Sequence, residues 1–113
     1  MRIPGADFAV VDPAKIRDYL LSPEHPVGRL KAVFFSALGY TRKDWRRLQH
    51  DLLVMVASEE AVLGRSSDFG QKYEVRGTIQ GPSGRRAEVV TVWIILASER
   101  SPRFVTAFPG EKR

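Results

Sequence analysis

The sequence contains no cysteine and only two histidines among its 113 residues. Without cysteine the chain can form neither a disulfide nor a thiolate metal site, and it has no thiol nucleophile. The two histidines stand in unrelated contexts, and no carboxylate cluster of the kind used by two-metal nucleases accompanies them. We therefore expect neither a metal centre nor any other cofactor.

Long apolar runs are also missing from the chain. No stretch approaches the ~18 apolar residues that would span a bilayer, so no membrane partner is expected. The opening residues Met1-Arg-Ile-Pro-Gly5 are interrupted before the apolar region of a signal peptide can form. These features predict a cytoplasmic protein.

Length and charge set the broad class of the protein. A chain of 113 residues suits a single domain with a real core, covering residues 1–113. The formal net charge of +5 is compatible with a polyanionic partner such as RNA. However, the basic residues are mostly arginine and are scattered, so the excess can equally reflect genomic base composition.

The segment Arg86–Ala97 is rich in β-branched residues and contains neither glycine nor proline, which predicts a central strand. Alternation places a hydroxyl and an indole, Thr91 and Trp93, on one side of this strand. The other side is an aliphatic row of Val90, Val92, Ile94 and Leu96. We expect helices to cover the aliphatic row and any site to lie on a half-open Thr91/Trp93 face.

Helical spacing dominates the first half of the chain, after an extended arm over residues 1–11. Asp12-Pro13 begins a helix that ends at Ser22-Pro23, with the aspartate as N-cap. A second helix is expected over residues 24–38, ending at Gly39, and a third from Thr41 to about Ser58. The expected buried stripe of the second helix is Val27, Leu30, Phe34, Ala37 and Leu38, and that of the third is Trp45, Leu48, Leu52, Met55 and Val56.

From residue 59 to 109 the pattern predicts an antiparallel sheet, followed by a charged tail at 110–113. Strands are expected at 61–63, 71–79, 86–97 and 103–108, and Gly81-Pro-Ser-Gly84 forms a turn between the middle two. Helices followed by strands predict an α+β fold. About three N-terminal helices, spanning 12–58, would pack on one face of a roughly four-stranded antiparallel sheet.

No single motif is a strong catalytic fingerprint, but the chain carries many cationic and hydroxyl side chains. They are His25, Arg29, Lys31, Lys72, Arg85, Arg86, Thr91 and Thr106. Metal-free RNA cleavage uses such groups to move two protons and to stabilise the phosphorane charge. The alternative is structural: a histidine before a helix start can be a cap, and lysine alternating along a strand is an ordinary exposed residue.

Several short motifs together resemble a widespread family of small bacterial domains of unassigned function, and the resemblance spans roughly residues 3–109. These domains occur alone or as C-terminal modules of polymorphic toxins, and they are similar to the barnase–EndoU–colicin–RelE ribonuclease fold. The motifs are Leu20-Leu-Ser-Pro-Glu-His-Pro-Val-Gly-Arg-Leu-Lys-Ala-Val-Phe-Phe35, Phe69-Gly-Gln-Lys-Tyr73, Gly81-Pro-Ser-Gly-Arg85, Val90-Thr-Val-Trp-Ile94 and Pro102-Arg-Phe-Val-Thr-Ala-Phe-Pro109.

The resemblance implies a small metal-independent endoribonuclease toxin, barnase- or RelE-like, with RNA as substrate and a small acidic antitoxin or immunity protein as partner. It implies His25 as general acid/base and Thr91 and Thr106 as positioning hydroxyls. The implied phosphate-binding or transition-state cations are Lys31, Lys72 and Arg85, and further binding residues are Arg29, Arg86 and Trp93. The usual tyrosine of the closing motif is Phe108 here, so a chemical role of that tyrosine would be lost.

Two other functions fit the same sequence. The first is a nucleic-acid-binding module of the same fold without catalysis. The second is a protein-interaction domain that uses the Thr91/Trp93 face.

Overall fold

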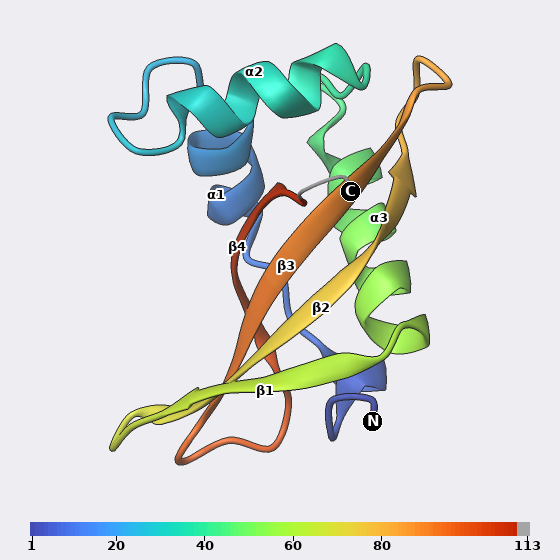
Figure 1. Cartoon of the computed structure of the whole chain (residues 1–113). Coiled ribbons are helices and arrows are strands. Elements are labelled where there is room, and N and C mark those ends of the chain that lie inside the picture. The colour runs from blue at the N-terminus through green and yellow to red at the C-terminus, as the bar shows by residue number, and fades with distance from the viewer. Residues whose placement is uncertain (111–113) are drawn as a thin grey trace.

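The computed structural model describes residues 1–110, and it has helices first and a four-stranded antiparallel sheet second (Figure 1). Strand order in the sheet is β1-β2-β3-β4, which confirms the predicted α+β class. The elements are η1 (Ala6–Phe8), α1 (Pro13–Lys15), η2 (Ile16–Leu20), α2 (Arg29–Ala37), α3 (Trp45–Ser58), β1 (Ala61–Ser66), β2 (Gly70–Gln80), β3 (Arg86–Leu96) and β4 (Arg103–Pro109). Residues 111–113, most of the predicted charged tail, lie outside the described residues. None of the helices in residues 1–110 is long and apolar enough to cross a membrane.

The helix starts follow the expected capping chemistry. The Asp12 carboxylate accepts a hydrogen bond from the Ala14 amide at 2.9 Å, and Pro13 occupies the first helical position. The Thr41 hydroxyl accepts one from the Asp44 amide at 3.1 Å, just before α3 begins. After Lys15 the first helix widens into one turn of π-type, η2.

The covered face of the sheet is the opposite of the one expected from the sequence. Thr91 and Trp93 are fully buried under the helices. The Thr91 hydroxyl donates to the Val75 carbonyl and accepts from the Trp93 indole N–H, both at 2.8 Å. The indole also packs edge-on against Phe104, with 5.3 Å between ring centroids. Because these polar groups satisfy each other, they need no solvent, and the predicted half-open Thr91/Trp93 face is wrong.

Within residues 1–110, no helix lies over the middle of the other face of the sheet (Figure 1), and we call this the open face. On β3 it presents Val90, which is buried, and the half-buried Val92, Ile94 and Leu96. Figure 1 shows α3 behind β2 and β3, with α1 and α2 grouped toward one end of the molecule. Of these helices, α3 contacts β2, whereas α1 and α2 contact β4 at the edge of the sheet.

The second helix is shorter than expected and turns a different side inward. Its buried residues include Ala32 and Phe35, followed by Leu38 at its end, whereas Val27 and Leu30 are 64% and 76% exposed. Both sets have helical spacing, so periodicity alone could not decide between them. The stripe expected on α3 is correct: Trp45 is half-buried, and the fully buried members are Leu48, Leu52, Met55 and Val56.

The edge strand β4 contains an irregularity that matters for the site. Val92 pairs with Thr106, but the next residue, Trp93, pairs with Phe104, so Val105 is an extra residue in β4. Such bulges twist an edge strand and redirect side chains near functional sites. The N-terminal segment lies along the outer edge of β4. There the Phe104 amide donates to the Val10 carbonyl at 2.9 Å.

Candidate functional site

A group of polar side chains surrounds Tyr19 where η2 meets the edge of β4. The Tyr19 hydroxyl lies 2.8 Å from the Thr106 hydroxyl. The His25 ring packs edge-on against the Tyr19 ring, with 5.1 Å between centroids. The ammonium groups of Lys31 and Lys15 lie 5.3 and 5.5 Å from the centre of the same ring. We call these five residues the Tyr19 cluster, and all five are half-buried.

A pocket of about 710 Å³ adjoins the Tyr19 cluster. This volume falls in the range of small-molecule sites and would accommodate a nucleotide. The bulged residue Val105 forms part of its wall, together with the first helical turn and the loop before α2. The lining residues are Asp12, Ala14, Lys15, Asp18, Tyr19, His25, Val27, Val105 and Thr106.

The His25 side chain is held by the backbone at the entrance to α2. Its Nδ1 atom accepts hydrogen bonds from the amides of Val27 at 3.0 Å and Gly28 at 2.9 Å. An Nδ1 that accepts two hydrogen bonds carries no proton, so the neutral ring carries its proton on Nε2. In this arrangement His25 caps the start of the helix, which is the structural role that the sequence offered as the alternative to catalysis. Toward the pocket, the ring presents an N–H donor rather than a free base.

The loop before α2 is fixed close to the Tyr19 backbone. A Cβ atom on Gly28 would lie 2.2 Å from the Tyr19 carbonyl oxygen, so only glycine fits there. This contact holds η2 and the start of α2 together. It therefore sets the distance between the phenol of Tyr19 and the imidazole of His25.

The environment of Tyr19 makes its phenol more acidic than usual. Partial burial raises the pKa of Tyr19, but the hydrogen bond with Thr106 and the charges of Lys31 and Lys15 lower it by more in total. The net pKa of Tyr19 lies below its ordinary value. A phenol with a lowered pKa is a better proton donor, and the two lysines would stabilise the phenolate that remains.

The structure brings three of the predicted catalytic residues together and separates the other three. His25, Lys31 and Thr106 all belong to the Tyr19 cluster. Thr91 lies in the core with Trp93. Lys72 and Arg85 are exposed and are not members of the cluster; Lys72 lies on β2 and Arg85 in the β2–β3 turn.

The predicted binding arginines and Arg85 lie outside the pocket. Ser83, in the turn that carries Arg85, bonds to Leu38 at the far end of α2, about 14 Å of helix away from His25. Arg86 lines a different hollow, between the end of β4 and α2. Arg29 is the exposed first residue of α2.

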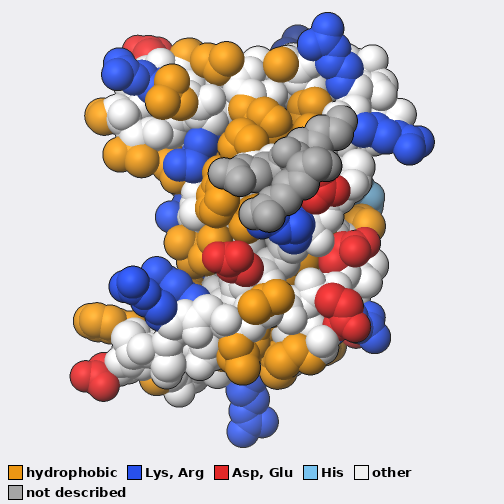
Figure 2. Space-filling view, in the orientation of Figure 1, with side chains coloured by type: hydrophobic (Ala, Val, Ile, Leu, Met, Phe, Trp, Pro, Cys, Tyr) orange, Lys and Arg blue, Asp and Glu red, His pale blue; other side chains and the backbone are white. Residues whose placement is uncertain are grey.

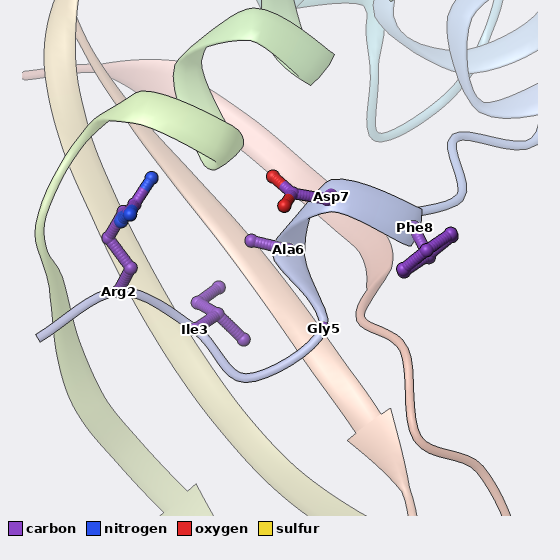
Figure 3. Close-up of a pocket in the computed structure, with 6 residues that line it drawn as sticks. All are labelled: Arg2, Ile3, Gly5, Ala6, Asp7 and Phe8. Carbon is purple, nitrogen blue, oxygen red and sulfur yellow. The ribbon is translucent and has the colours of Figure 1, made fainter.

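A further pocket surrounds the N-terminal turn, and Figure 3 shows its six lining residues from Arg2 to Phe8. In that view Ile3 and Ala6 lie within the turn, and Phe8 extends away from it. The pocket contains none of the predicted site residues, and its charged residues are Arg2 and Asp7. Because the Arg2 guanidinium donates to the Ala57 carbonyl at 2.7 Å, we assign no function to this pocket.

Sequence reasoning missed Tyr19, the centre of the cluster. Helical spacing places Tyr19 on one apolar face of the first helix with Ile16 and Leu20, and those two are fully buried. The spacing of Lys15 and Tyr19, four residues apart in a helix, was the available sign that a cation would lie on this ring. The wide η2 turn then orients the phenol toward β4.

Comparisons with known proteins agree with this fold. A family model described as "Domain of unknown function (DUF6883)" matches residues 2–111. One chain of a solved structure, "Contact-dependent growth inhibition toxin - immunity protein complex from Klebsiella pneumoniae 342", superposes with a TM-score of 0.71 at 24% sequence identity. The match covers 89% of this chain and 99% of that chain, so the two share a fold. No curated protein matches the sequence.

Proposed function

The chain belongs to the family described as Domain of unknown function (DUF6883), and we propose that it is a metal-independent endoribonuclease domain of a toxin. One observation carries this proposal: the Tyr19 phenol lies within reach of two lysines and a hydroxyl, beside a pocket of about 710 Å³. The shared fold with a chain of a toxin–immunity protein complex supports the toxin part of the proposal. The expected site of action is the cytoplasm, where RNA is found.

In the proposed reaction the ribose 2′-hydroxyl attacks the adjacent phosphorus, and the bond from phosphorus to the 5′-oxygen breaks. Tyr19 gives its proton to the departing 5′-oxygen, and Lys31 and Lys15 stabilise the phenolate. The His25 Nε2–H donates a hydrogen bond to a phosphate oxygen, and the Thr106 hydroxyl donates to the Tyr19 oxygen, which leaves the phenol proton free for the 5′-oxygen. The products are a 2′,3′-cyclic phosphate and a 5′-hydroxyl.

The positive net charge supports an acidic protein partner more strongly than it supports RNA recognition. On the face in Figure 2, basic and acidic side chains are interspersed with apolar ones, so the cations do not form one continuous track. A chain with a formal charge of +5 would still attract an acidic protein. We propose a small acidic immunity protein or antitoxin as the partner. The alternative interface at Thr91/Trp93 is ruled out because both side chains are fully buried.

The test is cleavage of a fluorophore-labelled RNA oligonucleotide by the whole chain in the presence of a chelator. Tyr19→Phe removes the proton donor and should slow cleavage by about 100-fold or more, as loss of a general acid does. Lys31→Ala should also slow it. Arg85→Ala is the matched control, because it removes an exposed charge far from the pocket and should change the rate less than about 3-fold.

The pH dependence gives an independent check on Tyr19. The donor must be protonated, so activity is lost as pH rises through the pKa of Tyr19. Because that pKa is lowered, the alkaline decline should begin below pH 10, the usual tyrosine value. RNA binding without cleavage would instead identify a non-catalytic module, and full activity of Tyr19→Phe or abolition by chelator would refute the mechanism.

A further inference from the structure

The Tyr19 cluster supplies a proton donor and cations, but the attack step also needs a group that removes the 2′-hydroxyl proton. The Nδ1 atom of His25 is occupied by two backbone amides. The two carboxylates that line the pocket are also engaged among the described residues. Asp12 accepts from the Ala14 amide, and Asp18 pairs with Arg42 at 3.0 Å. A base must therefore come from another element.

The strand register brings one carboxylate to the right row of the sheet. Glu74 on β2 pairs with Val92 on β3, and Val92 pairs with Thr106 on β4. The neighbours Tyr73 and Val75 are buried in the core, as is Ala107 beside Thr106. Alternation therefore places the side chains of Glu74 and Thr106 on the open face, on either side of Val92.

The separation suits a phosphodiester. Two strand spacings of about 4.8 Å put the Cα atoms of Glu74 and Thr106 roughly 10 Å apart. A phosphodiester would therefore bind in the gap over Val92, between the two side chains. The hydroxyl of Tyr19 already lies at the Thr106 end of this gap. The half-buried Val92 side chain forms an apolar floor beneath it.

The surroundings of Glu74 leave its carboxylate available. Glu74 is exposed, and its side chain makes no hydrogen bond or ion pair within residues 1–110. The charged groups on the same face of β2 are Lys72 and Arg76, one on each side. On the neighbouring strands Glu74 faces only Val62 and Val92. Two flanking cations would also help to hold the phosphate that Glu74 would otherwise repel.

We propose that Glu74 is the general base of the reaction, acting across Val92 from Tyr19. Its carboxylate takes the proton of the 2′-hydroxyl as the oxygen–phosphorus bond forms. Tyr19 gives a proton to the 5′-oxygen as that bond breaks, and the proton on Glu74 then returns to the phenolate through water. This inference rests on the proposed ribonuclease function and adds a residue that neither the sequence motifs nor the pocket contains.

The experiment measures single-turnover cleavage of a labelled RNA oligonucleotide by wild type, Glu74→Gln and Glu74→Asp, over a range of pH. Glutamine keeps the shape but cannot accept the proton, so the rate should fall by about 100-fold or more. The acid-side dependence of the rate should disappear in Glu74→Gln. Glu74→Asp should retain part of the rate. Glu88→Gln is the matched control on the open face, where Glu88 accepts from Thr78, and it should stay within about 3-fold of wild type.

Binding separates a base from a contact residue. The dissociation constant for an all-2′-O-methyl strand, which cannot be cleaved, should be unchanged or lower in Glu74→Gln, because a negative charge has been removed. Wild-type rates in Glu74→Gln, or a loss confined to binding, would overturn the role of Glu74 and leave the ribonuclease function intact. A wild-type protein that does not cleave RNA would overturn both.

Discussion

The two faces of β3 treat polar atoms in opposite ways. On the covered face the hydroxyl of Thr91 and the indole of Trp93 bond to each other and to the backbone, so no polar atom is left over. On the open face the carboxylate of Glu74 lies beside an aliphatic row and has no partner among residues 1–110. A polar residue on a strand therefore indicates an open face only when its neighbours cannot satisfy it.

The same distinction applies within the Tyr19 cluster. The Nδ1 atom of His25 already accepts hydrogen bonds from two backbone amides, whereas its Nε2 atom makes no hydrogen bond among the described residues. The Tyr19 hydroxyl bonds to Thr106 and can still reach a ligand. The cluster thus combines fixed positions with free atoms, which is what a catalytic arrangement requires.

The largest loss of stability should come from truncating a buried side chain on the covered face. Trp93→Ala removes a fully buried side chain and should lower the free energy of unfolding by about 3–5 kcal/mol. Ile94→Ala, one residue along but on the open face, removes a half-buried side chain and should cost roughly half of that or less. Urea denaturation of both variants measures the difference, and equal losses would contradict the assignment of the faces.

A smaller loss should follow from breaking the internal hydrogen bonds of the covered face. Thr91→Val keeps the volume but leaves the buried indole N–H of Trp93 without a partner, which should cost about 1–3 kcal/mol. In a Trp93→Phe background, Thr91→Val should lower the free energy of unfolding by less, because phenylalanine has no indole N–H to be left without an acceptor. Thr78→Val, on an exposed part of β2, is the control and should change stability by at most about 0.5 kcal/mol. Additive losses in the double variant would show that the two side chains are not coupled.

Much of the architecture could be predicted because local rules and the final fold agree. The cap at Asp12, the stripe of α3 and the turn around Gly84 each have one physical solution. The facing of α2 and β3 could not be predicted in the same way. Each element has apolar residues on both sides, so tertiary packing makes the choice.

The site was harder to predict than the fold because it depends on contacts between distant residues. Tyr19 and Thr106 are 87 residues apart, and the bulge at Val105 was invisible to the pattern of alternation. The motif positions included His25, Lys31 and Thr106, and the structure places all three in the Tyr19 cluster. They gave no indication of Tyr19, whose role comes from the lysines and the hydroxyl around it.

The smallest effect, and the most informative about His25, should come from replacing its ring by other capping groups. His25→Asn supplies a side-chain oxygen that can accept from the amides of Val27 and Gly28, so stability should change by only a few tenths of a kcal/mol. His25→Ala removes the acceptor and should cost about 1 kcal/mol. Thermal unfolding of both variants measures this difference.

Cleavage by the same two variants then separates the two functions of the ring. If His25 only caps α2, His25→Asn should cleave RNA at the wild-type rate. If the Nε2–H also holds the phosphate, as proposed here, His25→Asn should fold normally yet lose rate, because the shorter amide cannot occupy both positions at once. A donor to the transition state is worth about 2–4 kcal/mol in a preorganised site, and the loss in rate should approach that value only if the bond strengthens as the phosphorane forms. Since the neutral ring gives a hydrogen bond and not a proton, the loss should be similar at all pH values where Tyr19 remains protonated.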